Sequence, residues 1–312
     1  MKKILFLFVS VALLATSCKK TEEPTGPKLI FKFKFDSTQT RLDNLGRPSS
    51  VNTAAGNAAQ SPVFHSMSAH YIELAPDSLS PLGIPSTNIL YRNAEVGTSP
   101  NNAIDFSKSI IKGEGEEFYS VPLKNLTIGT YKWLRISLAY QNYDIKMQYR
   151  YAAYNSGTPF TFNGEVASFL GFNSYITSYN IKGENITING NRKQGYGAVK
   201  AYGLPGGYNI AAVEWPAPAA GRTTVVNPFA GTLGIPPGSC LVTGKFTSPI
   251  TITGNETKDI IVTVSLSTKQ SFEWFDKRAD GIYEPVDGLN SNAPLDSVVD
   301  MGIRGIIPIV TQ

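Results

Sequence analysis

A strict alternation of apolar and polar side chains constrains the fold of this chain more than any other feature. Residues 29–35 read LIFKFKF, with leucine or phenylalanine at every second position. The same two-residue period returns in residues 131–140, 145–151 and 260–266. Because successive side chains of a β-strand point to opposite faces, each segment is expected to be a strand with one buried face. In the last apolar segment, Pro308 indicates an edge strand, since proline has no N–H to donate.

Turn signals between these segments indicate the fold class. Asn142-Tyr143-Asp144 separates two alternating segments and predicts a hairpin turn. Glycine, proline and asparagine interrupt residues 155–240 at short intervals, and no segment has the period of a long amphipathic helix. The chain is therefore predicted to be all-β, an antiparallel β-sandwich that is elaborated or doubled. This body would occupy residues 29–312, either as one extended unit or with a subdivision near 155–160.

The N-terminus carries a second strong signal. Lys2 and Lys3 precede an apolar run of 11 residues, 4–14. A helix that spans a bilayer needs about 20 apolar residues, so this run has the length of a signal-peptide core. Small residues follow the run and lead directly to Cys18. Residues 1–17 are therefore predicted to be a signal peptide.

Residues 14–18, LATSC, resemble the lipobox of bacterial lipoproteins. The resemblance implies that Cys18 receives a diacylglyceryl group and becomes the first residue of the mature chain. Acyl chains such as palmitate would then anchor the protein in the outer membrane, because two or three chains hold a protein stably where one does not. Residues 18–28 would form a polar tether that contains proline. The alternative is an ordinary secretory signal followed by an incidental cysteine.

Two further resemblances concern the chain as a whole. The lipobox, the tether and the β-rich body together are similar to Bacteroidota cell-envelope lipoproteins of unassigned function. The opening strand and residues 63–74 resemble MbnP-like β-sandwich proteins, but no metal ligands are transferred because the chain has only two histidines.

Three Asp-Ser triplets resemble the O-glycosylation sites of Bacteroidota exported proteins. The serines that this resemblance implies as modified are Ser37, Ser78 and Ser297.

The charge of the chain limits its partners. A net charge of +4 falls to +2 when Lys2 and Lys3 leave with the signal peptide. The mature chain thus lacks the strongly basic character of a nucleic-acid-binding protein. The partners we expect are the membrane, through the N-terminal lipid, and either a carbohydrate or another envelope protein. A periplasmic and a surface-exposed position both stay open.

Few residues could support catalysis or bind a metal. His65 and His70 lie in one expected strand, and their separation of five places them on opposite faces, away from a shared metal ion. Cys240 is the thiol that remains once Cys18 carries lipid, and its apolar neighbours favour a position in the core. The nucleophile-elbow, phosphate-loop and zinc-protease motifs are absent from the sequence. No catalytic residue, metal ligand or cofactor is therefore assigned.

Acidic residues leave one alternative open. Glu114, Glu116 and Glu117 lie among Gly113, Gly115 and Phe118, and adjacent carboxylates of this kind usually form a solvated turn. Six more acids lie within 25 residues near the C-terminus, where calcium would need six to eight closely spaced oxygen ligands. Their spacing does not match an EF-hand, so polar turns are favoured and a calcium site is the alternative. These six are Asp276, Asp280, Glu284, Asp287, Asp296 and Asp300.

Aromatic side chains are the one indication of a ligand. Trp133 lies on the polar face of its strand, Trp215 stands beside prolines, and Trp274 belongs to a Phe-Glu-Trp-Phe segment. Exposed aromatic rings can stack on sugars, although aromatic residues also fill cores. The main prediction is a non-enzymatic, lipid-anchored β-sandwich that binds a ligand or serves as a structural or accessory component. The alternative is an envelope glycan hydrolase that uses carboxylates from separate loops.

Overall fold

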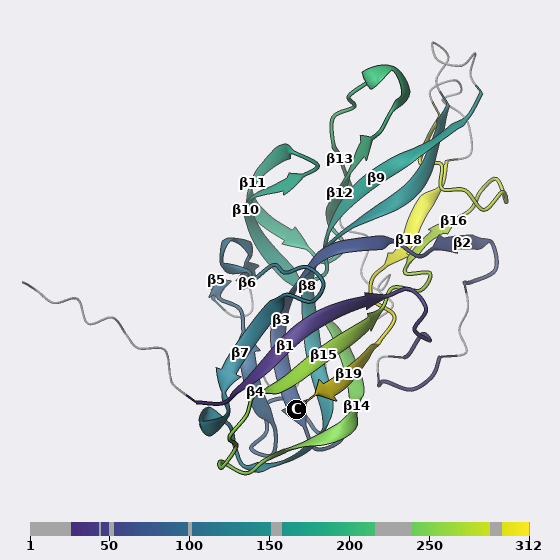
Figure 1. The fold of residues 1–312 in the computed structure, drawn as a ribbon. Coiled ribbons are helices and arrows are strands. Elements are labelled where there is room, and N and C mark those ends of the chain that lie inside the picture. The colour runs from purple at the N-terminus through teal and green to yellow at the C-terminus, as the bar shows by residue number, and fades with distance from the viewer. Residues whose placement is uncertain are drawn as a thin grey trace, which may run out of the picture.

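The computed structural model describes residues 26–43, 45–49, 53–98, 102–150, 158–215, 239–287 and 295–311. The predicted signal peptide, Cys18 and the first part of the predicted tether lie outside these residues. Within them, helix is limited to the short turns η1 (Phe106–Lys108), η2 (Leu123–Asn125) and η4 (Pro205–Gly207). The all-β prediction is confirmed, and Figure 1 shows the sheets of an elaborated sandwich.

The first sheet contains the strand in which the tether ends. Its strand order is β19-β15-β1-β7. The apolar face of β1 was correctly predicted, because Leu29, Phe31 and Phe33 are buried. β1 pairs in parallel with β15, and Pro308 lies on β19 at the edge of the sheet, as expected. The bounds are β1 (Lys28–Asp36), β7 (Glu117–Pro122), β15 (Ile260–Ser267) and β19 (Ile306–Thr311).

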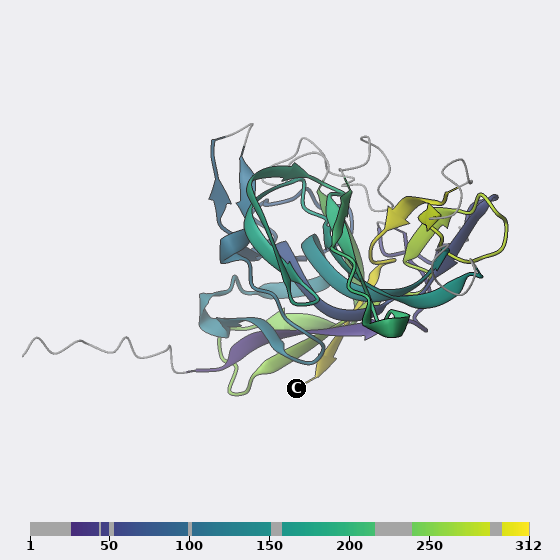
Figure 2. The ribbon, with the colours of Figure 1, turned by 90° about the horizontal axis from the view of Figure 1, so that it is seen from above.

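The second sheet has eight strands and is curled into a half-barrel, as Figure 2 shows from above. Its main order is β13-β12-β9-β8-β3-β4, and β14 and β17 also pair with β8. A large apolar core lies between this sheet and the first sheet. The bounds are β3 (Val63–Ala75), β4 (Asn88–Arg92), β8 (Gly129–Arg150), β9 (Phe160–Phe169), β12 (Gly197–Tyr202), β13 (Val213–Trp215), β14 (Cys240–Ile252) and β17 (Val286–Asp287).

The hairpin predicted at Asn142-Tyr143-Asp144 is wrong. Strand β8 runs without a break for 22 residues, and Asn142 pairs with Ser66 on one side and Ala167 on the other. The alternation changes phase here because the β3–β8 register shifts at Ala139. Even-numbered residues 134–138 face the main core before this shift, and odd-numbered residues 143–147 face it afterwards. A phase change of this kind resembles a turn in the sequence, although the strand continues.

A third sheet covers the outer face of the eight-stranded sheet. It has the order β11-β10-β6-β5. A second apolar core, which includes Tyr140, Phe169 and Tyr179, lies between the two. The large sheet is thus covered by the first sheet on one face and by the third sheet on the other. The bounds are β5 (Glu95–Val96), β6 (Ala103–Asp105), β10 (Asn173–Ile181) and β11 (Glu184–Lys193).

A fourth, small sheet lies at one end of the sandwich, beyond β19 in Figure 1. It consists of β2 (Asn57–Gln60), β16 (Phe272–Phe275) and β18 (Ser297–Met301) in the order β18-β16-β2. Residues 155–157 of the subdivision predicted near 155–160 lie outside the described chain. The strands on either side of it, β8 and β9, pair with each other from Tyr140 and Phe169 to Tyr149 and Phe160.

Candidate ligand-binding site

An apolar cavity of about 320 Å³ lies where β9, β12 and β13 extend beyond the first sheet (Figure 1). Its walls come from β8, β9, β12 and β13, from the chain just before β13, and from a segment that follows β16. This volume is at the lower end of the range of small-molecule sites. The lining residues are Met147, Gln148, Tyr149, Phe162, Val199, Ala201, Ile210, Ala211, Val213, Trp215, Tyr283 and Pro285.

Strand alternation brings most of the lining residues to one face. Met147 pairs with Phe162 across β8 and β9, and Val199 pairs with Val213 across β12 and β13. Residues directly opposite in an antiparallel pair point to the same face. Met147 and Phe162 also belong to the main core. The cavity is therefore the outer end of that core, at a place where the first sheet no longer covers it.

Two glycines shape the wall beside Trp215. A side chain at Gly197 would lie 2.8 Å from the indole of Trp215 and 2.6 Å from the Ala167 carbonyl oxygen. The indole can therefore lie against strand β12 only because residue 197 has no Cβ. Its Nε1 donates a hydrogen bond of 3.2 Å to the carbonyl of Gly195. Trp215 is thus held half-buried, in a fixed orientation, at the edge of the cavity.

The lining is mainly hydrocarbon. Ile210 and Val213 are exposed at its rim, with 39% and 53% of their surface accessible. Burial raises the pKa of the Tyr283 phenol, so this side chain stays neutral. A site that selects sugars needs several convergent polar groups, whereas these walls favour an apolar group.

A buried lysine on the other face of β12 holds one wall in place. Lys200 Nζ donates to Glu184 Oε2 at 2.7 Å, to Asn209 Oδ1 at 2.7 Å and to the carbonyl of Ile210 at 2.5 Å. Glu184 also accepts from the backbone N–H of Ala212. The hydrogen bond from Lys200 lowers the pKa of Glu184, which therefore stays ionised. This network fixes the segment that supplies Ile210 and Ala211 to the cavity.

The three tryptophans of the sequence prediction lie in different environments. Trp215 lines the cavity, and Trp133 is half-buried on β8. Trp274 is only 1% exposed and packs against Phe272 and Tyr283. Its proposed role in ligand stacking is therefore wrong in this structure, since a core ring cannot meet a ligand. The three rings do not form a common platform.

The three serines proposed for O-glycosylation also differ. Asp36 Oδ1 accepts from the N–H of Thr38, and Asp77 Oδ1 accepts from the N–H of Leu79. Each of these turns presents its serine at the surface, Ser37 fully exposed and Ser78 partly exposed. Ser297 is exposed on strand β18 instead. Its neighbour Asp296 is buried and accepts from the N–H groups of Lys277 and Glu284.

The histidines lie at irregular positions of β3. His65 and His70 are the extra residues where the β3–β8 register shifts, so simple alternation does not apply to them. His65 Nε2 lies 3.0 Å from Asp144 Oδ2, and His70 Nε2 lies 2.8 Å from Glu95 Oε1. Among the described residues, no three His, Cys, Asp or Glu side chains are grouped so that they could hold a metal ion.

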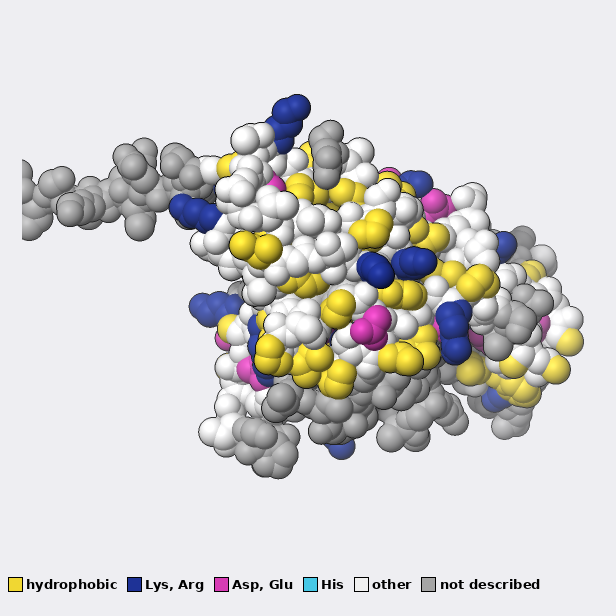
Figure 3. Space-filling view, turned by 90° about the horizontal axis from the view of Figure 1, so that it is seen from below, with side chains coloured by type: hydrophobic (Ala, Val, Ile, Leu, Met, Phe, Trp, Pro, Cys, Tyr) yellow, Lys and Arg dark blue, Asp and Glu magenta, His cyan; other side chains and the backbone are white. Residues whose placement is uncertain are grey.

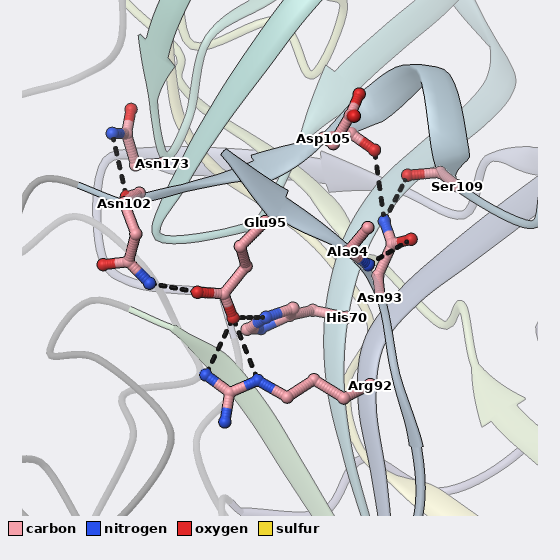
Figure 4. A network of polar contacts seen from close by, with 9 residues as sticks. All are labelled: His70, Arg92, Asn93, Ala94, Glu95, Asn102, Asp105, Ser109 and Asn173. Atoms are coloured by element: carbon pink, nitrogen blue, oxygen red, sulfur yellow. Dashed lines mark hydrogen bonds and ion pairs between the residues drawn. The ribbon is translucent and has the colours of Figure 1, made fainter. Parts of the chain in front are cut away.

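The network around His70 connects the large sheet to the third sheet (Figure 4). The buried His70 and the Arg92 guanidinium both bond Oε1 of Glu95, and Asn102 donates to its Oε2. Burial alone would raise the pKa of Glu95, but these hydrogen bonds outweigh it and lower the pKa to about 2. Asn93 Nδ2 donates to Ser109 Oγ at 2.7 Å and to the carbonyl of Asp105 at 3.4 Å, and its Oδ1 accepts from the N–H of Ala94. The network therefore pins the segment between β4 and β6 onto strand β3.

The acidic residues near the C-terminus bind groups of the protein itself. Glu284 is fully buried and accepts from Arg150 and Arg278. Asp300 accepts from Arg304 at 2.7 Å, and Asp276 accepts from the N–H groups of a following turn. The side chain of Asp287 is not among those that the structure describes. Asp276 and Asp280 thus lie in the polar turn that the sequence analysis favoured, whereas Glu284, Asp296 and Asp300 are buried, the last of them on strand β18.

Cys240 lies in the main core, 4% exposed, and is paired in register with Leu138. Burial raises the pKa of its thiol to about 12, so the thiolate that a nucleophile requires is scarce at neutral pH. The core prediction for Cys240 is confirmed. Glu114 and Glu116 accept from backbone N–H groups of Phe35 and Gly113 at the surface, as in a turn.

Comparison of the chain with protein-family models, with curated proteins and with solved structures finds no match. Any function must therefore be argued from the residues themselves. Over the part of the chain that the structure describes, no helix has the length and apolar character to cross a bilayer. The sequence analysis identified Trp215 but missed Gly197, Val199 and Ala201. The alternation of Val199 and Ala201 with Lys200 indicates a strand with one apolar face. It does not indicate that the space beside that face is unfilled.

Proposed function

We propose that this protein is a lipid-anchored, non-enzymatic component of the bacterial cell envelope that binds an apolar ligand in the cavity beside Trp215. The N-terminal sequence LATSC supports the anchor, because it resembles a lipobox and follows a short apolar run. The outer membrane is the proposed location. The observation that carries the binding role is the cavity, whose walls are apolar and whose tryptophan is fixed in orientation.

The chemistry of the walls favours one ligand class. A volume of about 320 Å³ accommodates an aromatic ring system or a short hydrocarbon chain rather than a folded polymer. Burial of such a group would remove apolar surface of Ile210, Val213 and Trp215 from water, which gives about 25 cal/mol for each Å². A carbohydrate would find few polar partners here. The proposed ligand is therefore a hydrocarbon group, alone or as part of a larger molecule.

The anchor is tested by mass spectrometry of the protein from cells that process lipoproteins. The expected N-terminal peptide begins with Cys18 and carries a diacylglyceryl group. A Cys18→Ala variant, which lacks the acceptor thiol, should lose the modification and leave the membrane fraction. A wild-type chain with a free thiol at Cys18 would contradict the proposal.

The cavity is tested with cis-parinaric acid, whose fluorescence rises in an apolar site. The folded chain should bind this probe and transfer tryptophan energy to it, and the Trp215→Phe variant should transfer less, because Trp215 borders the cavity directly. Ala201→Phe places a ring in the cavity and should weaken binding about tenfold, a loss of about 1.4 kcal/mol. Ala55→Phe, at an exposed turn, is the matched control. Equal binding by both alanine variants, with unchanged circular dichroism, would exclude this cavity as the site.

A further inference from the structure

The chain enters the sandwich at one defined end. The carbonyl of Pro27 accepts from the N–H of Leu123, the first residue of η2, and the N–H of Lys28 donates to Asp259 Oδ1 at 2.8 Å. The entry point is thus held between η2 and the turn that connects β14 to β15. In Figure 1 these segments lie at the lower end of the molecule, together with the start of β8.

Exposed aliphatic side chains surround this entry point. Ile128, which follows η2, is 69% exposed and lies beside Gly254 in the β14–β15 turn. Ile89 is 51% exposed, and its neighbour Asn88 is hydrogen-bonded to Thr127. The two isoleucines therefore stand on adjacent segments at the same end. A single exposed isoleucine is common on a protein surface, so the two at this end gain significance only together with the lysines and the tether beside them.

Basic side chains accompany the isoleucines. Lys124 lies in η2, Lys132 at the start of β8 and Lys258 in the β14–β15 turn, and all three are exposed. Figure 3, which looks onto the molecule from below, shows hydrophobic side chains interspersed with lysine and arginine. Aliphatic groups that enter the interface and lysines that meet anionic headgroups are the combination that favours a phospholipid surface.

The tether limits how far this end can move from an anchor. Ten residues from Cys18 to Pro27 span at most about 33 Å when fully extended. A body held by such a tether meets the bilayer more often with the end where the tether enters than with any other part. The short reach thus raises the local concentration of headgroups at Ile128 and its neighbouring lysines.

We propose that the end of the sandwich formed by Ile89, Lys124, Ile128 and Lys258 rests on an anionic phospholipid surface. This inference rests on the proposed lipid anchor, since the anchor brings that end to the bilayer. The contact would orient the body, with the large sheet rising away from the membrane. The cavity, at the other end of that sheet, would then face away from the bilayer.

The test couples the unlipidated mature chain, residues 18–312, through Cys18 to vesicles that carry a maleimide lipid. Cys240 is buried and does not compete for the maleimide. The vesicles contain phosphatidylcholine and phosphatidylglycerol in equal parts, with brominated acyl chains that quench nearby tryptophan. Since coupling is chemical, the experiment does not depend on whether cells lipidate Cys18.

An Ile128→Trp variant and a Phe275→Trp variant report on the two ends. Phe275 is 44% exposed on β16, which makes it a matched control. The brominated acyl chains should quench the fluorescence of the introduced tryptophan about twofold more at position 128 than at position 275. Equal quenching at the two positions would overturn the proposal, because the tether would then hold the body without orienting it.

The charges are tested with uncoupled protein and the same vesicles. Lys124→Ala and Lys258→Ala should each lower partitioning about fivefold, whereas Lys269→Ala, in the turn between β15 and β16, should not change it. Vesicles of phosphatidylcholine alone carry no net charge. Partitioning onto them should fall by more than either lysine substitution lowers it, because none of the lysines then meets an anionic headgroup. Concentration-dependent dimers that Ile128→Asp dissociates would instead assign this surface to a second copy of the chain and overturn the proposal.

Discussion

The two halves of strand β8 differ in what covers them. Residues 134–143, the closed half, are buried on both faces between the first and third sheets. Residues 144–150, the open half, alternate in exposure and line the cavity on one face. Both halves belong to one uninterrupted strand, but their neighbours differ: β14 pairs with the strand only up to Leu138, β3 only up to Asp144, and β9 from Tyr140 onward. The contrast shows that distant segments, rather than the strand itself, decide whether a stretch of sheet becomes core or binding surface.

The largest effect is expected from a buried ion pair in the closed half. Arg135 and Glu73 are fully buried, and Arg135 Nη1 lies 3.3 Å from Glu73 Oε2. Glu73→Gln leaves the guanidinium without its counter-charge and should lower the free energy of unfolding by about 4 kcal/mol. Denaturant unfolding measures this loss. The double variant Glu73→Gln/Arg135→Met should recover part of it, and failure to recover any would show that the pair is not the cause.

Acid should weaken the attachment of the third sheet to the closed half. The pKa of Glu95 is about 2 in the fold, below its ordinary value of 4.5, so its stabilising effect is complete above pH 4.5 and is lost as the pH falls toward 2. The loss over that range should be on the order of 3 kcal/mol. Glu95→Gln should show a flatter dependence of unfolding free energy on pH. A variant with the same dependence as the wild type would assign the acid sensitivity to other groups.

Truncation of one side chain in each half compares their packing directly. Ile136→Ala, in the closed half, should cost about 4 kcal/mol, because the neighbours on both sides cannot close the gap. Met147→Ala, in the open half, should cost about 2 kcal/mol, since one side of Met147 already borders empty space. Equilibrium unfolding in urea measures both values. Equal losses would mean that the cavity wall is packed as tightly as the core.

The smallest effect is expected at Cys240, which lies on β14 and pairs with Leu138 of the closed half. Its pKa is raised to about 12, so native protein should not react with a thiol reagent at neutral pH, whereas unfolded protein should react fully. Cys240→Ala removes one buried sulfur and should cost about 1 kcal/mol. Rapid reaction of the native thiol would show that the closed half opens on the time scale of the assay.

The alternation of apolar and polar residues predicts a strand wherever only one face of that strand is buried. The sequence analysis identified β1 and β15 correctly because they have this pattern. Strand β8 was divided wrongly because the register shift at Ala139 changes the phase of its alternation, as a turn between two strands would. The positions of His65 and His70 depend on register shifts against β8, which leave no mark in the sequence of β3. The same limit applies to Trp215 and Trp274. Their burial depends on Gly197 and on Tyr283, which belong to other segments of the chain.

The parallel pairing of β1 with β15 has a consequence for how the protein matures. Leu29 pairs with Ile260, so the first strand of the body receives this neighbour only after most of the polypeptide has been synthesised. Contacts over such long separations make folding slow. A product that ended before Ile260 would retain its N-terminal segment but lack the strands that close the first sheet. Proteases that degrade unfolded chains should therefore remove prematurely terminated products rapidly.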